Sequence, residues 1–175
     1  MIFTAYADGV LDLGHVQVPC VLGSTGVVDA AAKREGDGAS PAGVWPLRFV
    51  YYRPDRVAPP LTSLEKRALP PDLGWSDAPP DDDYNRPVRL PHDASAEALW
   101  REDHVYDLIV VLGHNDAPVV PGAGSAIFLH VARDDWSPTQ GCVALNYGDL
   151  LDLLAMAGPG DALAISALGF AQATS

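Results

Sequence analysis

The chain has 175 residues, a length that fits one domain with its own core and leaves no room for a second large domain. Asp and Glu number 23 against 11 Lys and Arg, a formal net charge of −12, and no basic cluster offers the footprint that phosphate backbones require. Apolar runs all stop well short of the roughly 18 residues that a membrane span needs. We therefore expect a soluble protein with no nucleic acid partner and no membrane insertion.

The N-terminal residues 1–16 carry no positive region followed by a long apolar stretch, so no secretory signal is expected in them. The two cysteines, Cys20 and Cys142, lie far apart and form no CxxC pair. A disulfide framework is therefore not expected, and Cys20 is interpreted as a buried strand residue.

The first 50 residues predict a mainly β segment. Apolar and polar residues alternate, Val, Ile, Tyr and Phe are frequent, and Gly, Asp and Pro mark the boundaries, as in half-buried antiparallel strands. The expected strands are residues 2–6, 10–13, 16–23 and 44–52.

Residues Arg53 to Pro91 differ in composition, because they hold nine of the chain's 16 prolines and the acidic run 81–83. Proline removes ladder donors and fixes φ, so we expect no regular sheet here. Apolar residues such as Leu61, Trp75 and Leu90 favour an ordered loop packed on the domain over a disordered linker. Loops of this length in compact domains are usually lids or binding loops, so this proline-rich insert is expected to be one.

The segment after the insert begins with a short expected helix at 96–101, with Ser95 as its N-cap. Two strongly apolar segments follow, residues 105–113 and 125–132, joined by a turn-rich connection. These are expected to be the central strands of the core.

The one clear helix is expected from Tyr147 to Ala157, because its leucines recur on one face and Gly158-Pro159 stops it. Asn146 is the expected N-cap, with Asp149 three residues on. A last strand is expected at 161–166.

The segment richest in chemistry is residues 127–146, IFLHVARDDWSPTQGCVALN. His130 ends an apolar strand and Cys142 directly follows Gly141, an arrangement that can bring an imidazole to a thiol. A free thiol with a pKa of about 8.5 needs a base or a positive dipole beside it, and the expected helix begins too late to supply the dipole. Amides around Gly141 can also point at a developing oxyanion. The alternative is that Cys142 is only a small buried hydrophobe.

This segment resembles the active-site motif of the L,D-transpeptidase catalytic domain, or YkuD-type, family, in which a strand-ending His is followed by a Ser/Thr-x-Gly-Cys signature. Here the motif is His130 and then Thr139-Gln140-Gly141-Cys142. Ser40-Pro41-Ala42-Gly43, ahead of a strand, resembles the family's TPxG segment. The resemblance covers the chain apart from the insert. It implies a β-sandwich of mixed sheets, with one main helix after the Cys motif and a final strand.

The resemblance also implies roles for individual residues. Cys142 would be the acyl-forming nucleophile and His130 its general base. Gly141 with neighbouring amides would bind the oxyanion, and the backbone carbonyl of Val131 would orient the His. No cofactor and no metal is implied.

Two positions depart from the family's usual signature. Gln140 stands where His is frequent, and Ala144 stands where an Arg is common. Loss of that cation alters the expected donor specificity and leaves the thiol chemistry intact. With Ala144 and the proline-rich insert, the chain resembles a compact proteobacterial branch of the family that makes 1,3 crosslinks, from L-Ala to diaminopimelate.

Several further residues are candidates for substrate contact. His114 and Asn115 follow the strand that neighbours the one ending at His130; the alternative is a turn whose Asn and Asp satisfy backbone amides. The remaining candidates are Thr139 and Gln140 of the motif, Trp136, and the triplet Tyr84-Asn85-Arg86. For Trp136 and the triplet the alternative is surface packing.

Arg86 could replace the cation missing at Ala144. A zinc site built from His114, His130 and Cys142 has suitable ligand types but no diagnostic spacing, so none is expected.

The expected function is therefore the crosslinking of two peptidoglycan stem peptides, a donor and an acceptor, through a thioester on Cys142. Carbapenem-type inhibitors would acylate the same thiol. One alternative uses water as acceptor, which makes the protein an L,D-carboxypeptidase or amidase. The other is a non-catalytic wall-binding module in which Cys142 only packs. The substrate implies the periplasm or cell envelope, and the oligomeric state is left open.

Overall fold

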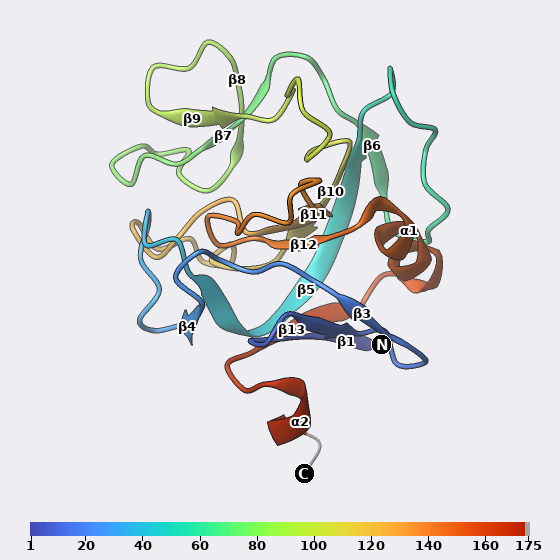
Figure 1. Cartoon of the computed structure of the whole chain (residues 1–175). Coiled ribbons are helices and arrows are strands. Elements are labelled where there is room, and N and C mark those ends of the chain that lie inside the picture. The colour runs from blue at the N-terminus through green and yellow to red at the C-terminus, as the bar shows by residue number, and fades with distance from the viewer. Residues whose placement is uncertain (174–175) are drawn as a thin grey trace.

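The computed structural model describes residues 1–173 and arranges their strands in three layers, with the small sheet at the top of Figure 1, β10–β12 in the middle and β1 and β13 below. The long strand β5 (Ser40–Tyr52) links the lower two layers. Its first part, from Gly43 to Pro46, pairs with β13, and its second part, from Leu47 to Tyr52, pairs with β10. One strand thus carries the chain from one side of a β-sandwich to the other.

The lower side of the sandwich is a mixed sheet. β1 lies parallel to β13, while β2 and β3 follow as antiparallel neighbours. These strands are β13 (Ala162–Ser166), β1 (Ile2–Tyr6), β2 (Val10–Asp12) and β3 (Gln17–Pro19).

The middle layer is also mixed, because β10 pairs antiparallel with β11 and β11 pairs parallel with β12. Two short strands add to β5 in parallel. The strands are β10 (Leu108–Leu112), β11 (Phe128–Val131), β12 (Val143–Leu145), β4 (Val27–Asp29) and β6 (Lys66–Ala68). The prediction of a mainly β fold with mixed sheets is confirmed.

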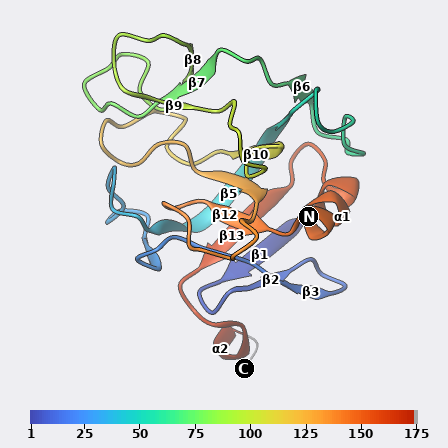
Figure 2. The same cartoon turned by 45° about the horizontal axis from the view of Figure 1, so that its top comes forward.

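Helix α1 (Tyr147–Met156) packs beside the sandwich, at the right of Figure 1. The Asn146 side chain accepts a hydrogen bond of 2.8 Å from the Asp149 amide, which is the predicted N-cap. The helix ends one residue before the predicted Ala157. The short α2 (Phe170–Ala173) lies beyond the lower sheet in both views (Figures 1 and 2), and Phe170 packs edge-on against Tyr6 of β1 with ring centroids 5.2 Å apart. No helix among the described residues has the length and apolar character to cross a bilayer.

Strands β10 and β11 are buried on both faces. Leu108, Val110 and Leu129 belong to the core between the two sandwich sheets and α1. Their alternating neighbours, Ile109 and Phe128 among them, belong to a second core beneath the insert. This burial explains why β10 reads as the continuous apolar run LIVVL.

The prediction that the proline-rich insert holds no regular sheet was wrong. Besides β6, it contributes β7 (Leu73–Ser76) and β8 (Pro87–Arg89) to an antiparallel three-stranded sheet. These strands are only three or four residues long, and every proline of the insert except Pro87 lies outside them. Pro87 is the first residue of an edge strand, where a missing N–H removes no ladder bond.

The predicted helix at 96–101 was also wrong, because residues 96–98 form strand β9 (Ala96–Ala98) against β7. A helix of six residues is only marginally stable on its own. The edge of β7 offers backbone partners to this segment, and tertiary pairing therefore prevails over local helix signals.

Candidate active site

The Cys142 thiol lies just ahead of β12 and is held between two backbone groups of the segment that leads into β11. Its Sγ donates to the Ala126 carbonyl oxygen at 3.2 Å, and the Phe128 amide donates to Sγ at 3.4 Å. Only 8% of the residue is exposed. Burial, aided by the negative charge of Glu97, raises the pKa of the thiol to about 12. The resting group is therefore a neutral thiol.

The His130 ring is held in one tautomer by the backbone. Its Nδ1 lies 2.9 Å from the Val131 carbonyl oxygen, and since a carbonyl only accepts, Nδ1 carries the hydrogen. Nε2 then has a lone pair available to take a proton. Tyr106 packs edge-on against the ring, with centroids 5.3 Å apart. Burial lowers the pKa of His130 to about 4, so the imidazole is neutral at pH 7.

The side chains of Cys142 and His130 line one cavity of about 410 Å³. They reach it because β11 and β12 are parallel neighbours, with His130 opposite Ala144, two residues after Cys142. The cavity wall is rich in charge of both signs. Its charged members are Lys33, Glu35, Asp77, Glu97, Arg101 and Arg133.

The turn before Cys142 is shaped by its own side chains. The Thr139 hydroxyl donates to the Cys142 carbonyl oxygen at 2.7 Å and accepts from the Gly141 amide at 3.1 Å. Ser40, fully buried at the start of β5, donates to the same carbonyl at 3.3 Å. Gly141 has φ of +127°, and a Cβ there would lie 2.8 Å from the Ala39 carbonyl oxygen. The motif positions Thr139 and Gly141 thus fix the backbone that presents the thiol.

The model of the L,D-transpeptidase catalytic domain family, YkuD, matches residues 2–165. The chain belongs to this family. A search of the curated proteins and a search of the solved structures each find no match. The match to the YkuD domain includes the insert and ends within β13, so the family extends over more of the chain than the residues that carry the sequence resemblance.

The remaining sequence candidates are distributed over several places in this YkuD domain. Thr139 and Gln140 line the cavity of Cys142. Arg86 lines a different cavity of about 370 Å³, and Trp136, 41% exposed, lines a third of about 590 Å³. Neither of these two residues is part of the wall around the thiol.

Asn85 is a buried link between the insert and the segment that carries Ala126. Its Oδ1 accepts from the indole of Trp75 at 2.9 Å and from the Ala126 amide at 3.0 Å. Its Nδ2 donates to the carbonyl oxygens of His114 at 3.1 Å and Asn115 at 2.8 Å. Asn85 therefore positions the backbone behind the thiol, away from the cavity wall.

The neighbours of Asn85 are structural in the same way. The Asn115 side chain bonds to backbone groups of Val120 and Gly124 in its own loop, as the turn alternative predicts. Tyr84 donates to Glu35 and accepts from the Gly124 amide. His114 contacts the Ala123 carbonyl oxygen through Nε2, and burial lowers its pKa.

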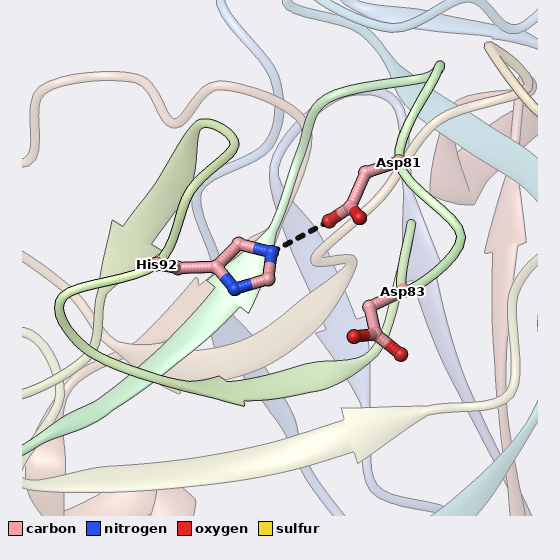
Figure 3. A group of neighbouring side chains, drawn as sticks. All are labelled: Asp81, Asp83 and His92. Carbon is pink, nitrogen blue, oxygen red and sulfur yellow. Dashed lines mark hydrogen bonds and ion pairs between the residues drawn. The ribbon is translucent and has the colours of Figure 1, made fainter.

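Within the described residues, one group of three possible metal ligands is close enough to share an ion: Asp81, Asp83 and His92, with ligand atoms within 4.8 Å (Figure 3). His114, His130 and Cys142 do not form such a group. His92 Nε2 lies 2.7 Å from Asp81 Oδ2, which also accepts from the Ser76 hydroxyl at 2.6 Å. These bonds lower the pKa of Asp81 to about 2. Protein partners therefore already satisfy this carboxylate.

Sequence reasoning missed Glu97, Tyr106 and Arg101 on the cavity wall. The Tyr106 hydroxyl donates to Glu97 Oε1 at 2.6 Å. Arg101 places a cation on the cavity wall, where its charge acts on His130, and it is bonded through two nitrogens to Asp103, at 2.8 and 2.7 Å. The pairing of β9 with β7 brings residues 97–101 to the cavity. The sequence favours a helix at 96–101 and so does not predict this contact.

Proposed function

We propose that this YkuD domain is a cysteine-dependent acyltransferase that crosslinks peptidoglycan stem peptides through a thioester on Cys142. The observation that carries the proposal is the cavity shared by the Cys142 thiol and by His130, whose Nε2 is free to accept a proton. The family supports stem peptides as the substrate class. This substrate lies in the cell wall, so we also propose that the protein works in the periplasm or cell envelope.

In the first half-reaction, Cys142 attacks the carbonyl carbon at an L-centre of the donor stem. With a thiol pKa of about 12 and an imidazole pKa of about 4, a free thiolate–imidazolium pair is strongly disfavoured. The proton therefore moves to His130 Nε2 as the sulfur attacks, and the Phe128 amide stabilises the charge on sulfur. His130 then returns the proton to the departing amine, and the thioester remains.

In the second half-reaction, an amine of the acceptor stem attacks the thioester and Cys142 leaves. The Gly141 amide is bonded to Thr139, so we assign the oxyanion to the amide of Cys142 itself. Ala144 supplies no cation for a donor carboxylate, whereas Arg101 and Arg133 line the cavity. These residues are the proposed basis for a donor specificity of the 1,3 type, in which L-Ala is joined to diaminopimelate.

Intact-protein mass spectrometry with a peptidoglycan tetrapeptide, or with a carbapenem, tests the nucleophile. We expect a covalent adduct on the wild type and on Cys20→Ala, but none on Cys142→Ala. Cys20 is the matched control, because burial raises its pKa to about 12 as well while it lies in the core between the sandwich sheets. Absence of any adduct on the wild type would favour the wall-binding module. Shortened monomers in place of crosslinked dimers would favour the hydrolase.

A further inference from the structure

Glu97, in strand β9 just after the insert, brings a carboxylate into the cavity that Cys142 and His130 line. It is the central residue of β9, opposite Trp75 of β7, and lines the same cavity as Cys142 and His130. The side chain is half-buried. Glu97 has no role in the proposed transfer of the proton between Cys142 and His130.

The carboxylate of Glu97 has no cation of its own. Oε1 accepts from the Tyr106 hydroxyl, and within residues 1–173 no group donates a hydrogen bond to Oε2 and no ion pair includes Glu97. Arg101, the nearby cation, is bonded to Asp103 instead. A carboxylate removed from water without a cation is costly, so this position suits a ligand that brings a positive charge.

The charges around Glu97 point to the same kind of ligand. Its pKa is raised by burial and by the negative charges of Asp77 and Glu35, while Tyr106 and Arg101 act in the opposite direction. Asp77 and Glu35 line the cavity too, and Asp77 Oδ1 is buried with no hydrogen-bond partner among residues 1–173. This side of the cavity therefore attracts cations.

The same negative charge opposes the first half-reaction, because Glu97 is a cause of the raised pKa of Cys142. Cancelling the charge of Glu97 would remove this cost to negative charge on the sulfur. An ammonium group bound at Glu97 would cancel it, and Cys142 could then leave the thioester more easily.

We propose that Glu97 binds the ammonium group of the acceptor stem and removes one of its protons before the amine attacks. The proposal rests on the proposed function. The Glu97 carboxylate takes a proton from R–NH₃⁺, and the neutral amine forms a C–N bond to the thioester carbonyl as the C–S bond breaks. As the C–S bond breaks, His130 takes the second proton from the nitrogen and passes it to the departing sulfur of Cys142. The protonated Glu97 returns its proton to solvent, which leaves an amide and a free thiol.

The test is the partition of the acyl-enzyme between amine and water in Glu97→Gln. A Gln oxygen can still accept from Tyr106, so the change removes charge and little else. We expect acylation of Cys142 by the donor to be as fast as in the wild type or faster. We expect the ratio of crosslinked dimer to hydrolysed monomer to fall by about 100-fold, the scale of general acid–base catalysis. Glu97→Asp should restore part of the ratio.

Two controls make the result specific to charge. Glu102→Gln changes an exposed glutamate outside the cavity wall and should leave the partition unchanged. Hydroxylamine, an acceptor that is uncharged at neutral pH, should react equally well with the acyl-enzymes of the wild type and of Glu97→Gln. An unchanged dimer-to-monomer ratio in Glu97→Gln would overturn the role of Glu97 while acylation still supports the proposed function. A wild type that forms no acyl-enzyme would overturn both.

Discussion

Cys142 and His130 are both buried, and burial moves their pKa values in opposite directions, so the pair rests as thiol and neutral imidazole. The Ala126 carbonyl accepts the thiol hydrogen, and the Val131 carbonyl accepts the hydrogen on His130 Nδ1. Each neutral group is therefore satisfied by backbone before substrate arrives. We expect such a site to be slow towards simple alkylating agents, and in the proposed mechanism the proton moves to His130 only as the sulfur attacks a bound carbonyl.

His130 makes stability depend on pH in a defined window. Its pKa is about 4 in the folded state and near 6.5 when unfolded, so the unfolded chain binds the extra proton first as the pH falls. The contribution of neutral His130 is present above pH 6.5 and is lost as the pH falls towards 4. The difference corresponds to about 3 kcal/mol. Between pH 7 and pH 4, we expect the free energy of unfolding, measured in urea, to fall by about 3 kcal/mol more in the wild type than in His130→Asn.

Asn is the appropriate replacement, because its amide nitrogen can take the place of Nδ1 and donate to the Val131 carbonyl oxygen. His92→Asn is the control: the pKa of His92 is raised by Asp81, so its loss should not reduce the acid sensitivity. Equal pH dependence in the wild type and in His130→Asn would contradict a buried neutral His130.

The site residues that the sequence analysis identified lie close to one another along the chain. Thr139, Gly141 and Cys142 form one turn, and His130 and Val131 are adjacent in β11. Glu97 reaches the cavity through the pairing of β9 with β7, a contact that no local pattern specifies.

At the scale of elements, the insert supports the site from behind. Trp75 of β7 and Ala126, the thiol's acceptor, share the Oδ1 atom of Asn85. Sequence patterns were sufficient for β1, β10 and α1, whose apolar periodicity and capping are local. They were insufficient for the three-stranded sheet, because its strands are too short to show a period and its prolines suggested a loop.

Asn85→Asp tests this link with almost no change in shape. The carboxylate keeps an acceptor for Trp75 and Ala126, but it loses both donors and faces the carbonyl oxygens of His114 and Asn115. Asn85 has φ of +56°, which Asp also tolerates, so the backbone is not the source of the effect. We expect a loss of about 2–4 kcal/mol in the free energy of unfolding.

Urea titration measures this change, with Asp82→Asn on the exposed acidic run as the control. The control should stay within about 0.5 kcal/mol of the wild type. A similarly small effect in Asn85→Asp would show that the buried amide hydrogen bonds contribute little to stability.

At the scale of the whole molecule, the two cores share strands. β10 and β11 supply alternating residues to the core of the sandwich and to the core beneath the insert. The chain has a net charge of −12, whereas the cavity that Cys142 and His130 line has three basic and three acidic side chains in its wall. Removing either core would expose one face of β10 and β11. We therefore propose that residues 1–175 act as one domain and that the insert is an integral layer of it.

Trp75→Ala tests the integral layer. Trp75 is 5% exposed and packs edge-on against Phe128 of β11, with ring centroids 5.0 Å apart. We expect a loss of about 3–5 kcal/mol, the usual cost of emptying such a site. Leu61→Ala, also in the insert but 79% exposed, should cost less than about 0.5 kcal/mol.

Urea unfolding of the wild type, followed by far-ultraviolet circular dichroism and by tryptophan fluorescence, should give one coincident transition. Two separate transitions, or a loss below about 1 kcal/mol in Trp75→Ala, would mean that the insert is a detachable lid.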